Sequence, residues 1–278
     1  MNILQGIAAT LAGLGGCLVA LVYAFQEHLL YFPAIPVRQY GEDPGDHLMP
    51  FEDVELVTED GIHAGNIGHR LPDVRQFYDS GFNVFIVSYR GYGDSAGKPS
   101  EKGFRLDARA ALAYCADRMD VLDTKKIFLF GRSIGGAVAI ATAAGPKGDD
   151  LAGIVVENTF TSIDNMIDVV LPPLKFFKFL NRNPWNSLTD ISSVESPILF
   201  ISGLRDELVP PAHMTKLYEA ATKSRKKAFF TVANGTHNDT WFRGGHAYRE
   251  AIRNFVSEIS QSYLLKGDVA RPSREQCQ

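Results

Sequence analysis

Residues 126–144, KIFLFGRSIGGAVAIATAA, carry the strongest structural signal in this chain. The apolar run Lys126 to Phe130 is typical of a buried parallel strand, and the small residues from Gly135 to Ala144 favour a helix. Ser133 lies between them at the centre of a Gly-x-Ser-x-Gly pattern. We therefore expect Ser133 on a sharp turn from strand to helix, with the two glycines of the pattern leaving room for tight packing.

A serine at such a turn is a candidate nucleophile. Its hydroxyl becomes reactive only when a base removes the proton, so it must project from the turn towards that base. The following helix directs unpaired backbone N–H groups at the same place, which makes the N–H of Ile134 a candidate donor to a developing oxyanion. The alternative is an ordinary glycine-rich turn between a strand and a helix.

A candidate acid follows a second apolar strand. Residues Pro197 to Ile201 read as a buried strand, and Asp206 lies in the loop after it. A carboxylate at the carboxyl end of a parallel strand faces the edge of the sheet where active sites form. Glu207 is the rival for this role, and Asp206 could instead cap the helix expected to begin near Ala212.

A candidate base follows a third strand, Lys227 to Val232, where His237 lies in a polar loop. Histidine suits the task because its ordinary pKa lies near neutrality, so it can take a proton and return it. Among the other histidines, four are interpreted as surface or helix residues: His28, His47, His213 and His246. Ser133, Asp206 and His237 thus occur in the order Ser, Asp, His, which is the order of α/β-hydrolases.

Strands and helices alternate along the rest of the chain. Further strands are expected at Val54–Val57, Asn83–Ser88 and Gly153–Glu157, and further helices at Asn66–Asp79, Glu101–Arg118, Ala212–Thr222 and Ala247–Tyr263. This alternation predicts an α/β fold with a mostly parallel sheet covered by helices on both faces.

Composition excludes several classes of function. The net charge is −4 with interspersed signs, which argues against a nucleic-acid partner. Cys17, Cys115 and Cys277 are far apart, so disulfides and a zinc site are not expected, nor is any other metal. A weak dinucleotide-binding pattern begins at Gly91, but Pro99 would break the helix that should follow it. We therefore expect no cofactor.

The N-terminus is a separate element. Residues Ile3 to Phe25 carry no charge and are long enough, as a helix, to cross ~30 Å of hydrocarbon. We expect a transmembrane signal anchor over residues 1–26, with a cleaved signal peptide as the alternative. A proline-containing linker (27–50), a hydrolase-type domain (51–264) and a disordered tail (265–278) are expected to follow.

A cap segment is expected over residues 161–189, between two core strands. Its apolar part, Leu171 to Trp185, has leucines and phenylalanines that could line an acyl-chain pocket or dip into a membrane surface, with Lys175 and Lys178 near the headgroups. Simple packing over the sheet is the alternative.

Five motifs together resemble one known family. They are Ala64-Gly65-Asn66-Ile67-Gly68-His69-Arg70, Ser88-Tyr89-Arg90-Gly91-Tyr92-Gly93, Gly131-Arg132-Ser133, Glu157-Asn158-Thr159-Phe160-Thr161-Ser162 and Ser202-Gly203-Leu204-Arg205-Asp206. The chain resembles the membrane-anchored hydrolases called alpha/beta hydrolase domain-containing protein 13, with the plant "wavy growth" and fungal bud-emergence proteins. The resemblance implies a single-pass serine hydrolase of endomembranes or the plasma membrane, with Ser133, Asp206 and His237 as its triad. Related anchored hydrolases cleave acyl thioesters from lipidated proteins, so a lipid-like or acylated substrate is implied.

The chain also departs from that family. Thr58 to His63 runs straight into Ala64-Gly65-Asn66, where we expect about thirty to forty residues of the family's fold to be absent, enough for two short strands. We therefore predict that strands 2 and 3 of the fold are missing. The third strand leads to the loop of the second oxyanion donor, for which Gly65 and Asn66 are the candidates.

Two functional hypotheses follow from these patterns. The first is a serine hydrolase of carboxylic esters or thioesters that forms an acyl-enzyme on Ser133, in a chain that the missing strands could impair. The second is a catalytically inactive membrane-bound interaction protein, or a truncated isoform. The sequence leaves the oligomeric state open.

Overall fold

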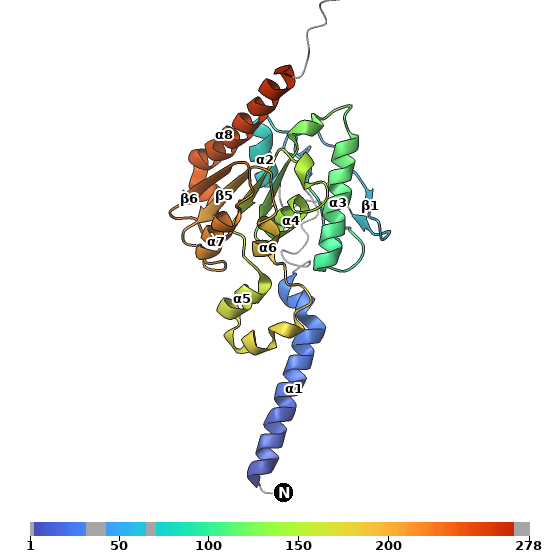
Figure 1. The fold of residues 1–278 in the computed structure, drawn as a ribbon. Coiled ribbons are helices and arrows are strands. Elements are labelled where there is room, and N and C mark those ends of the chain that lie inside the picture. The colour runs from blue at the N-terminus through green and yellow to red at the C-terminus, as the bar shows by residue number, and fades with distance from the viewer. Residues whose placement is uncertain (1–2, 32–42, 65–70, 270–278) are drawn as a thin grey trace, which may run out of the picture.

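The centre of the molecule is a four-stranded parallel sheet. The computed structural model describes residues 3–31, 43–64 and 71–269. Its main sheet runs in the order β3 (Phe128–Arg132), β4 (Gly153–Glu157), β5 (Ile198–Gly203) and β6 (Lys227–Val232), as Figure 1 shows. The register pairs Phe130 with Val155 and Ile201 with Phe230. The predicted fold class, a parallel sheet with helices on both faces, is confirmed.

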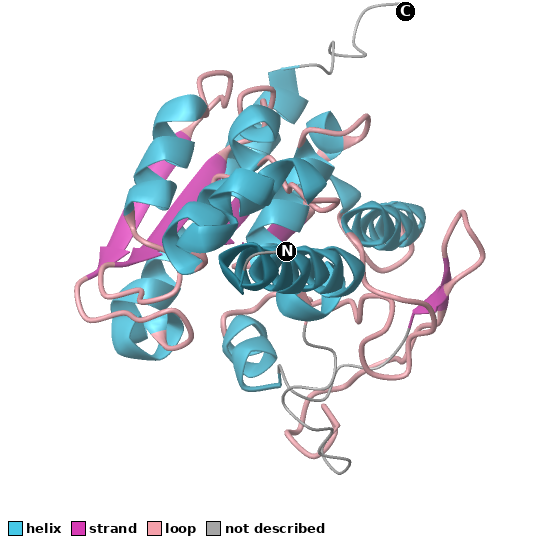
Figure 2. Ribbon diagram, turned by 90° about the horizontal axis from the view of Figure 1, so that it is seen from below, coloured by secondary structure: helices cyan, strands magenta, loops and turns pink. Residues whose placement is uncertain are grey.

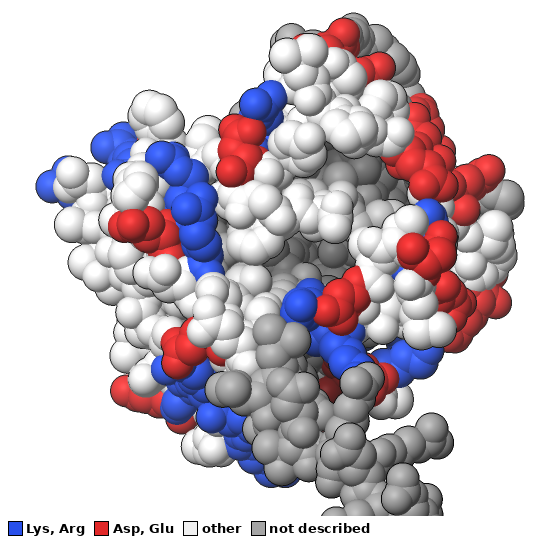
Figure 3. All heavy atoms as spheres, turned by 90° about the horizontal axis from the view of Figure 1, so that it is seen from above, with Lys and Arg blue, Asp and Glu red and all other residues white. Residues whose placement is uncertain are grey.

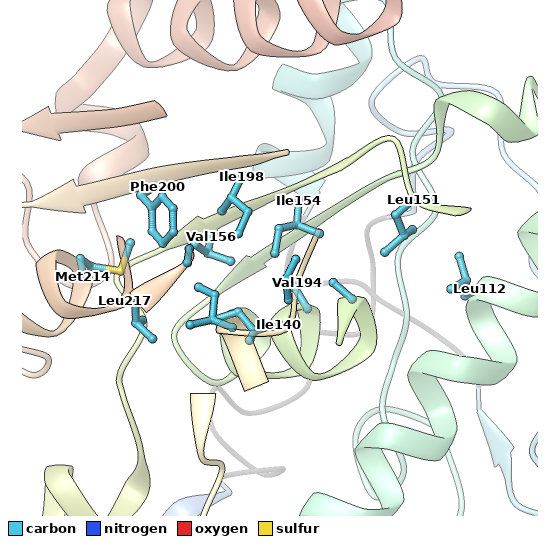
Figure 4. Close-up of a cluster of buried hydrophobic side chains, with 14 residues drawn as sticks. Leu112, Ile140, Leu151, Ile154, Val156, Val194, Ile198, Phe200, Met214 and Leu217 are labelled. Atoms are coloured by element: carbon cyan, nitrogen blue, oxygen red, sulfur yellow. The ribbon is translucent and has the colours of Figure 1, made fainter. Parts of the chain in front are cut away.

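Alternate residues of the central strands point into two separate cores. Ile154 and Val156 of β4 belong to one buried cluster, whereas Val155 belongs to the other. This period of two is what a strand buried on both faces requires. Figure 4 shows the first cluster, which β4 and β5 form with α4 (Ile134–Ala143), α6 (Ser187–Ile191) and α7 (Ala212–Ala220). The long helix α8 (Thr240–Val269) covers the opposite face, so helices enclose the sheet on both sides (Figure 2).

Most of the predicted elements are present, with shifted ends. Strands β4 and β6 have the predicted bounds, β3 begins two residues later than predicted, and α3 spans Glu101–Asp117. Helix α2 spans Leu71–Asp79, and the single turns η2 (Thr124–Lys126) and η3 (Gly148–Asp150) precede β3 and β4. Residues 265–269, predicted to begin a disordered tail, form the last part of α8.

The strand predicted at Asn83–Ser88 is the main error. This segment has no regular secondary structure, and among the described residues β3 is the edge strand of its sheet. A cavity of about 2400 Å³ is lined both by this segment and by β3, and the surface seen from the side opposite α1 is hollowed near its centre (Figure 3). The segment has the composition of a strand, but it pairs with no strand among the described residues, and a strand needs the ladder hydrogen bonds of such a partner.

A small hairpin precedes this region. Strand β1 (Leu56–Val57) pairs antiparallel with β2 (His63–Ala64), so a two-residue second strand is present, and β1 is shorter than predicted. Residues 65–70, where a third strand would begin, lie outside the described residues. The loss of a third strand therefore stays a prediction.

Arg90 joins the hairpin to α3. Its guanidinium donates to Asp107 Oδ1 at 2.7 Å and to Asp60 Oδ2 at 2.8 Å, while its own backbone N–H donates to Asp107 Oδ2. Arg90 and Asp107 are both buried. A buried charge is stable only when it is paired and hydrogen-bonded, so this cluster fixes the chain that follows Asn83–Ser88.

The N-terminal helix α1 (Ile3–Leu30) extends away from the domain (Figure 1). Its segment Ala9–Leu30 is apolar and long enough to cross a membrane. The helix ends later than the predicted anchor, and its last turns form hydrogen bonds with Leu180, Arg182 and Asn183 of the segment between β4 and β5. This segment contains α5 (Ile163–Val170), the 3₁₀ helix η4 (Pro172–Leu180) and α6.

Candidate active site

Ser133 lies between β3 and α4 in a backbone conformation that few residues adopt. Its φ of 54° is in the left-handed region, which costs on the order of 1–3 kcal/mol for a residue other than glycine. Neighbouring groups hold it there: Ser133 N–H donates to Glu157 O at 2.9 Å, and Thr159 Oγ1 donates to Ser133 O at 2.7 Å. The predicted turn is present, and the hydrogen bonds with Glu157 of β4 and with Thr159 hold Ser133 in this strained conformation.

The two glycines of the Gly-x-Ser-x-Gly pattern differ in the space around them. A Cβ on Gly131 would lie 2.1 Å from the backbone oxygen of Gly135, so only glycine fits at Gly131. A Cβ on Gly135 would meet no described atom within 4 Å. The second close approach is instead at Gly136, where a Cβ would lie 2.6 Å from Thr159 Cβ. Tight packing at Gly135, as predicted, is therefore not what the described residues show.

The structure brings Ser133, His237 and Asp206 together at the carboxyl edge of the sheet. His237 Nε2 lies 3.0 Å from Ser133 Oγ, and His237 Nδ1 lies 2.8 Å from Asp206 Oδ2. The side chains of His237 and Asp206 are almost fully buried. These three residues are separated by up to 104 positions in the sequence, yet they form one continuous chain of hydrogen bonds.

Asp206 and Glu207 have different partners. The second carboxylate oxygen of Asp206 accepts N–H groups from Leu208 at 2.9 Å and Val209 at 2.7 Å, which fixes the carboxylate against the imidazole. Glu207 Oε2 lies 3.3 Å from the backbone nitrogen of His237 and has no contact with the ring. The geometry therefore favours Asp206 over its rival as the partner of the imidazole.

Asn158 joins the two loops that hold the acid and the base. Its amide donates to Thr236 O at 3.1 Å, to His237 O at 3.3 Å and to Thr240 Oγ1 at 3.0 Å, and its oxygen accepts the N–H of Gly203 at 2.8 Å. Asn158 is buried. Sequence reasoning noted it only within the Glu157–Ser162 motif and gave it no role, because its partners come from other strand ends.

His213 was predicted to be a surface or helix residue, and it is a buried helix residue. Its Nδ1 accepts the N–H of Thr161 at 3.2 Å and lies 2.9 Å from Thr161 Oγ1. Burial lowers the pKa of His213, and the charge of Lys216 lowers it further, whereas Asp206 opposes both. Accepting the N–H of Thr161 requires an unprotonated Nδ1, and the direction of the pKa shift agrees with this hydrogen bond.

The oxyanion candidates are only partly described. Ile134 is the first residue of α4, so its N–H is one of those that a helix leaves without an intrahelical partner. Ile134, Ser133 and His237 line the same cavity. Gly65 and Asn66 lie outside the described residues.

This arrangement can perform nucleophilic chemistry at a carbonyl. His237 can take the proton of Ser133 Oγ as the oxygen attacks, because Nε2 is within hydrogen-bond distance. Asp206 accepts a hydrogen bond from Nδ1, which keeps Nε2 free to act as the base and stabilises the imidazolium that forms. A helix N-terminus favours negative charge, so the N–H of Ile134 stays the candidate donor to an oxyanion.

The chain is similar to proteins of known family. Residues 62–190 match a family model described as "Serine aminopeptidase, S33" (Hydrolase_4). The chain is 39% identical to the alpha/beta hydrolase domain-containing protein WAV2 of Arabidopsis thaliana, an alignment that covers 91% of this chain and 96% of WAV2. It is 36% identical to protein bem46 of Schizosaccharomyces pombe and 40% identical to an uncharacterized membrane protein, YNL320W, of Saccharomyces cerevisiae, covering 92% of each relative.

Solved structures share the fold. The esterase Pf2001 of Pyrococcus furiosus superposes with a TM-score of 0.65 at 21% identity, covering 80% of this chain and 98% of the esterase. An alpha-beta hydrolase from Vibrio vulnificus gives a TM-score of 0.67 at 19% identity, covering 82% of this chain and 92% of that hydrolase. At these identities the likeness concerns the fold alone. The relatives above show that the chain belongs to the α/β-hydrolase family of alpha/beta hydrolase domain-containing protein 13 and bem46.

Proposed function

We propose that this protein is a serine hydrolase that cleaves carboxylic esters or thioesters through an acyl-enzyme on Ser133. The observation that carries the proposal is the continuous hydrogen-bonded chain from Ser133 Oγ through His237 to Asp206. In the first step His237 deprotonates Ser133, which attacks the carbonyl carbon, and the proton then passes to the leaving alcohol or thiol. In the second step His237 activates a water that releases the acyl group as a carboxylic acid.

The surroundings of Ser133 support an acyl group as the part that is bound. The cavity that contains Ser133 and His237 has an apolar wall, to which α5 and η4 contribute Ile167, Leu174 and Phe177. Apolar walls with a few polar groups are typical of sites for small or lipid-like ligands. A long acyl chain would lie on this wall while its carbonyl reaches Ser133.

A single-pass membrane anchor is part of the proposal. It is supported by the segment Ala9–Leu30, which has a mean hydropathy of 1.6 and is not buried inside the structure. The relative YNL320W is named a membrane protein. The hydrolase domain would then work beside the bilayer, where acylated substrates are concentrated.

A second candidate is a chain with the triad but weak or no activity. It is favoured by the edge position of β3 and by the cavity between β3 and Asn83–Ser88. The loop that would supply the second oxyanion donor, at Gly65 and Asn66, directly follows the place of the strand predicted to be missing, and losing one such donor lowers kcat by about 10²- to 10³-fold. The two candidates differ in rate and not in the residues used.

Turnover with trapping of the intermediate tests the proposal. The detergent-solubilised chain is given p-nitrophenyl butyrate or a butyryl thioester, quenched in acid and digested. We expect turnover with a butyryl group on the peptide that contains Ser133, and a loss of at least about 10³-fold in kcat/KM for Ser133→Ala. Undiminished turnover by Ser133→Ala would overturn the proposal, and absence of turnover in both would favour the second candidate.

A further inference from the structure

Helix η4 exposes large apolar side chains beside the end of α1. Phe176 and Phe179 are 73% and 79% exposed, and none of the residues of η4 is buried. In a 3₁₀ helix, residues three apart lie one above the other, so these two rings form one face. The end of α5 extends the exposed apolar surface with Val169 and Val170. A contiguous apolar surface of this kind marks an interaction site.

Polar contacts fix η4 and the residues after it against the last turns of α1. Gln26 Nε2 donates to Leu180 O at 3.2 Å, and Gln26 Oε1 accepts the N–H of Arg182 at 2.7 Å. Glu27 accepts hydrogen bonds from Arg182 at 2.6 Å and from Asn183 at 3.0 Å. The position of η4 relative to α1 is therefore set by several contacts.

A buried cluster continues this connection into the domain. Tyr31, the residue after α1, donates to Asn183 Oδ1 at 3.1 Å and accepts the indole N–H of Trp185 at 2.9 Å. Tyr31 and Trp185 are both buried. Helix α1, if it spans a bilayer, therefore holds α5 and η4 at the level where its apolar segment ends, as the arrangement in Figure 1 shows.

We propose that α5 and η4 form a docking surface for the headgroup and acyl boundary of a phospholipid bilayer, with Phe176 and Phe179 inserted among the acyl chains. The continuity of this surface with the apolar helix α1 selects a bilayer over a protein partner. Aromatic and aliphatic side chains on one face of a short helix are typical of segments that lie in a membrane interface.

The charges of this surface specify the kind of lipid interaction. Lys178 forms an ion pair with Asp168, with Nζ 2.6 Å from Oδ2. The Nζ of Lys175 lies 5.0 Å from the centre of the Phe176 ring. The two lysines of α5 and η4 are matched by Asp164 and Asp168, so the segment Ile163–Leu180 has no net charge. Docking is therefore driven by the apolar side chains, and neutral phosphatidylcholine suffices as the lipid.

The docking surface also gives acyl chains a route to Ser133. The cavity that contains Ser133 is lined by Val22 and Leu29 of α1 and by Leu174 and Phe177 of η4. An acyl chain can leave the bilayer between α1 and η4 without crossing water. This part of the inference rests on the proposed function, and it makes the substrate a membrane-resident ester or thioester with a long acyl chain.

The test uses the full chain in phosphatidylcholine vesicles. Cys17, Cys115 and Cys277 are replaced by alanine, and an environment-sensitive nitrobenzoxadiazole dye is attached through Phe176→Cys. The matched control is Met119→Cys, because Met119 is 74% exposed and lies in the connection between α3 and β3. This connection leads to the amino end of β3, whereas α5 follows the carboxyl end of β4. We expect blue-shifted emission and quenching by brominated phosphatidylcholine at position 176, and neither at position 119. A dye at position 176 that behaves like the one at position 119 would overturn the docking surface.

A second measurement concerns the substrate route. The double variant Phe176→Ser, Phe179→Ser should lose about tenfold or more in hydrolysis of a long-chain ester held in the vesicles, with little change for soluble p-nitrophenyl butyrate. Equal loss on both esters would contradict entry from the bilayer. If neither ester is turned over, the proposed hydrolase fails while the dye at position 176 still reports docking, so the two failures are distinguishable.

Discussion

At the scale of single residues, the most informative comparison is between Asp206 and Glu207 as the partner of the His237 imidazole. Asp206 contacts the ring of His237 and two backbone N–H groups, whereas Glu207 contacts only the backbone of His237. We predict that Asp206→Asn lowers kcat by about 10⁴-fold, because an amide in this place favours the wrong tautomer of the imidazole. Glu207→Gln, the matched control, should change kcat little. Steady-state hydrolysis of p-nitrophenyl butyrate measures both, and a larger loss for Glu207→Gln would reverse the assignment.

His213 makes the stability of the fold depend on pH. Its Nδ1 accepts an N–H from Thr161, which a protonated ring cannot do, and burial lowers its pKa below the ordinary 6.5. The unfolded chain therefore binds the proton more readily. Stabilisation by neutral His213 is fully present above about pH 6.5 and is lost as the pH falls towards the lower pKa of the folded state.

We predict that His213→Asn flattens this acid-side decline in the free energy of unfolding. The measurement is urea unfolding between pH 7.5 and pH 5, compared as slopes and not as absolute values. The exposed His246 supplies the control, since His246→Asn should have the same slope of unfolding free energy against pH as the parent chain. Parallel pH profiles for His213→Asn and the parent would show that His213 does not titrate in this way.

At the scale of elements, the turn from β3 to α4 can be tested through its glycines. Gly131 has no room for a Cβ, whereas Gly135 meets no described neighbour within 4 Å. Gly131→Ala should destabilise the fold by several kcal/mol (about 3), because the turn must open to relieve the overlap with Gly135. Gly135→Ala should be neutral or stabilise by about 0.5–1 kcal/mol, because alanine favours the helix. Thermal unfolding of the two variants distinguishes them, and equal losses would contradict the tight turn.

The elements also show where sequence patterns stop being informative. Strands β4 and β5 follow from apolar runs, since every residue of both strands is buried between neighbouring strands and helices. Strand β6 follows from its apolar run as well, although only Val232 of it is buried. Asn83–Ser88 has the same composition but pairs with no strand among the described residues, so its prediction as a strand failed. The strand prediction depends on a neighbour, which composition alone does not supply.

That the three candidate residues lie close together was predictable for a similar reason, whereas some of their contacts were not. Ser133, Asp206 and His237 each follow an apolar strand, and parallel strands bring their carboxyl ends to one edge. The role of Asn158 could not be predicted from the sequence, because its side-chain amide contacts Gly203 and Thr240, which lie 45 and 82 positions away in the chain. The placement of η4 against α1 depends likewise on contacts more than 150 residues apart, such as Gln26 with Leu180.

At the scale of the whole molecule, the edge position of β3 invites a direct experiment. The alignment with WAV2 runs over 297 positions, more than the 278 residues of this chain, so WAV2 has residues without a counterpart here. We predict that these WAV2 residues lie after its counterpart of His63, and that inserting them after His63 here adds a strand beside β3 and fills the cavity there. Burying several apolar side chains in this way should raise Tm by at least about 10 °C.

The control for this insertion is a glycine and serine segment of equal length at the same place. It should leave Tm unchanged or lower it, because it supplies chain without apolar side chains. Equal Tm values for the two insertions would show that the WAV2 segment forms no stabilising strand beside β3. A higher Tm for the WAV2 segment alone would assign the cavity to a strand that this chain lacks.

The central claim, that this chain assembles a working nucleophile, is tested most directly by labelling with a fluorophosphonate. The full, detergent-solubilised chain is treated with the probe beside Ser133→Ala, and the modified peptide is identified by mass spectrometry. The account predicts one label, on Ser133, because His237 Nε2 lies 3.0 Å from its hydroxyl oxygen, and no label in Ser133→Ala. Label that persists in Ser133→Ala, or a native chain that takes none, would contradict it.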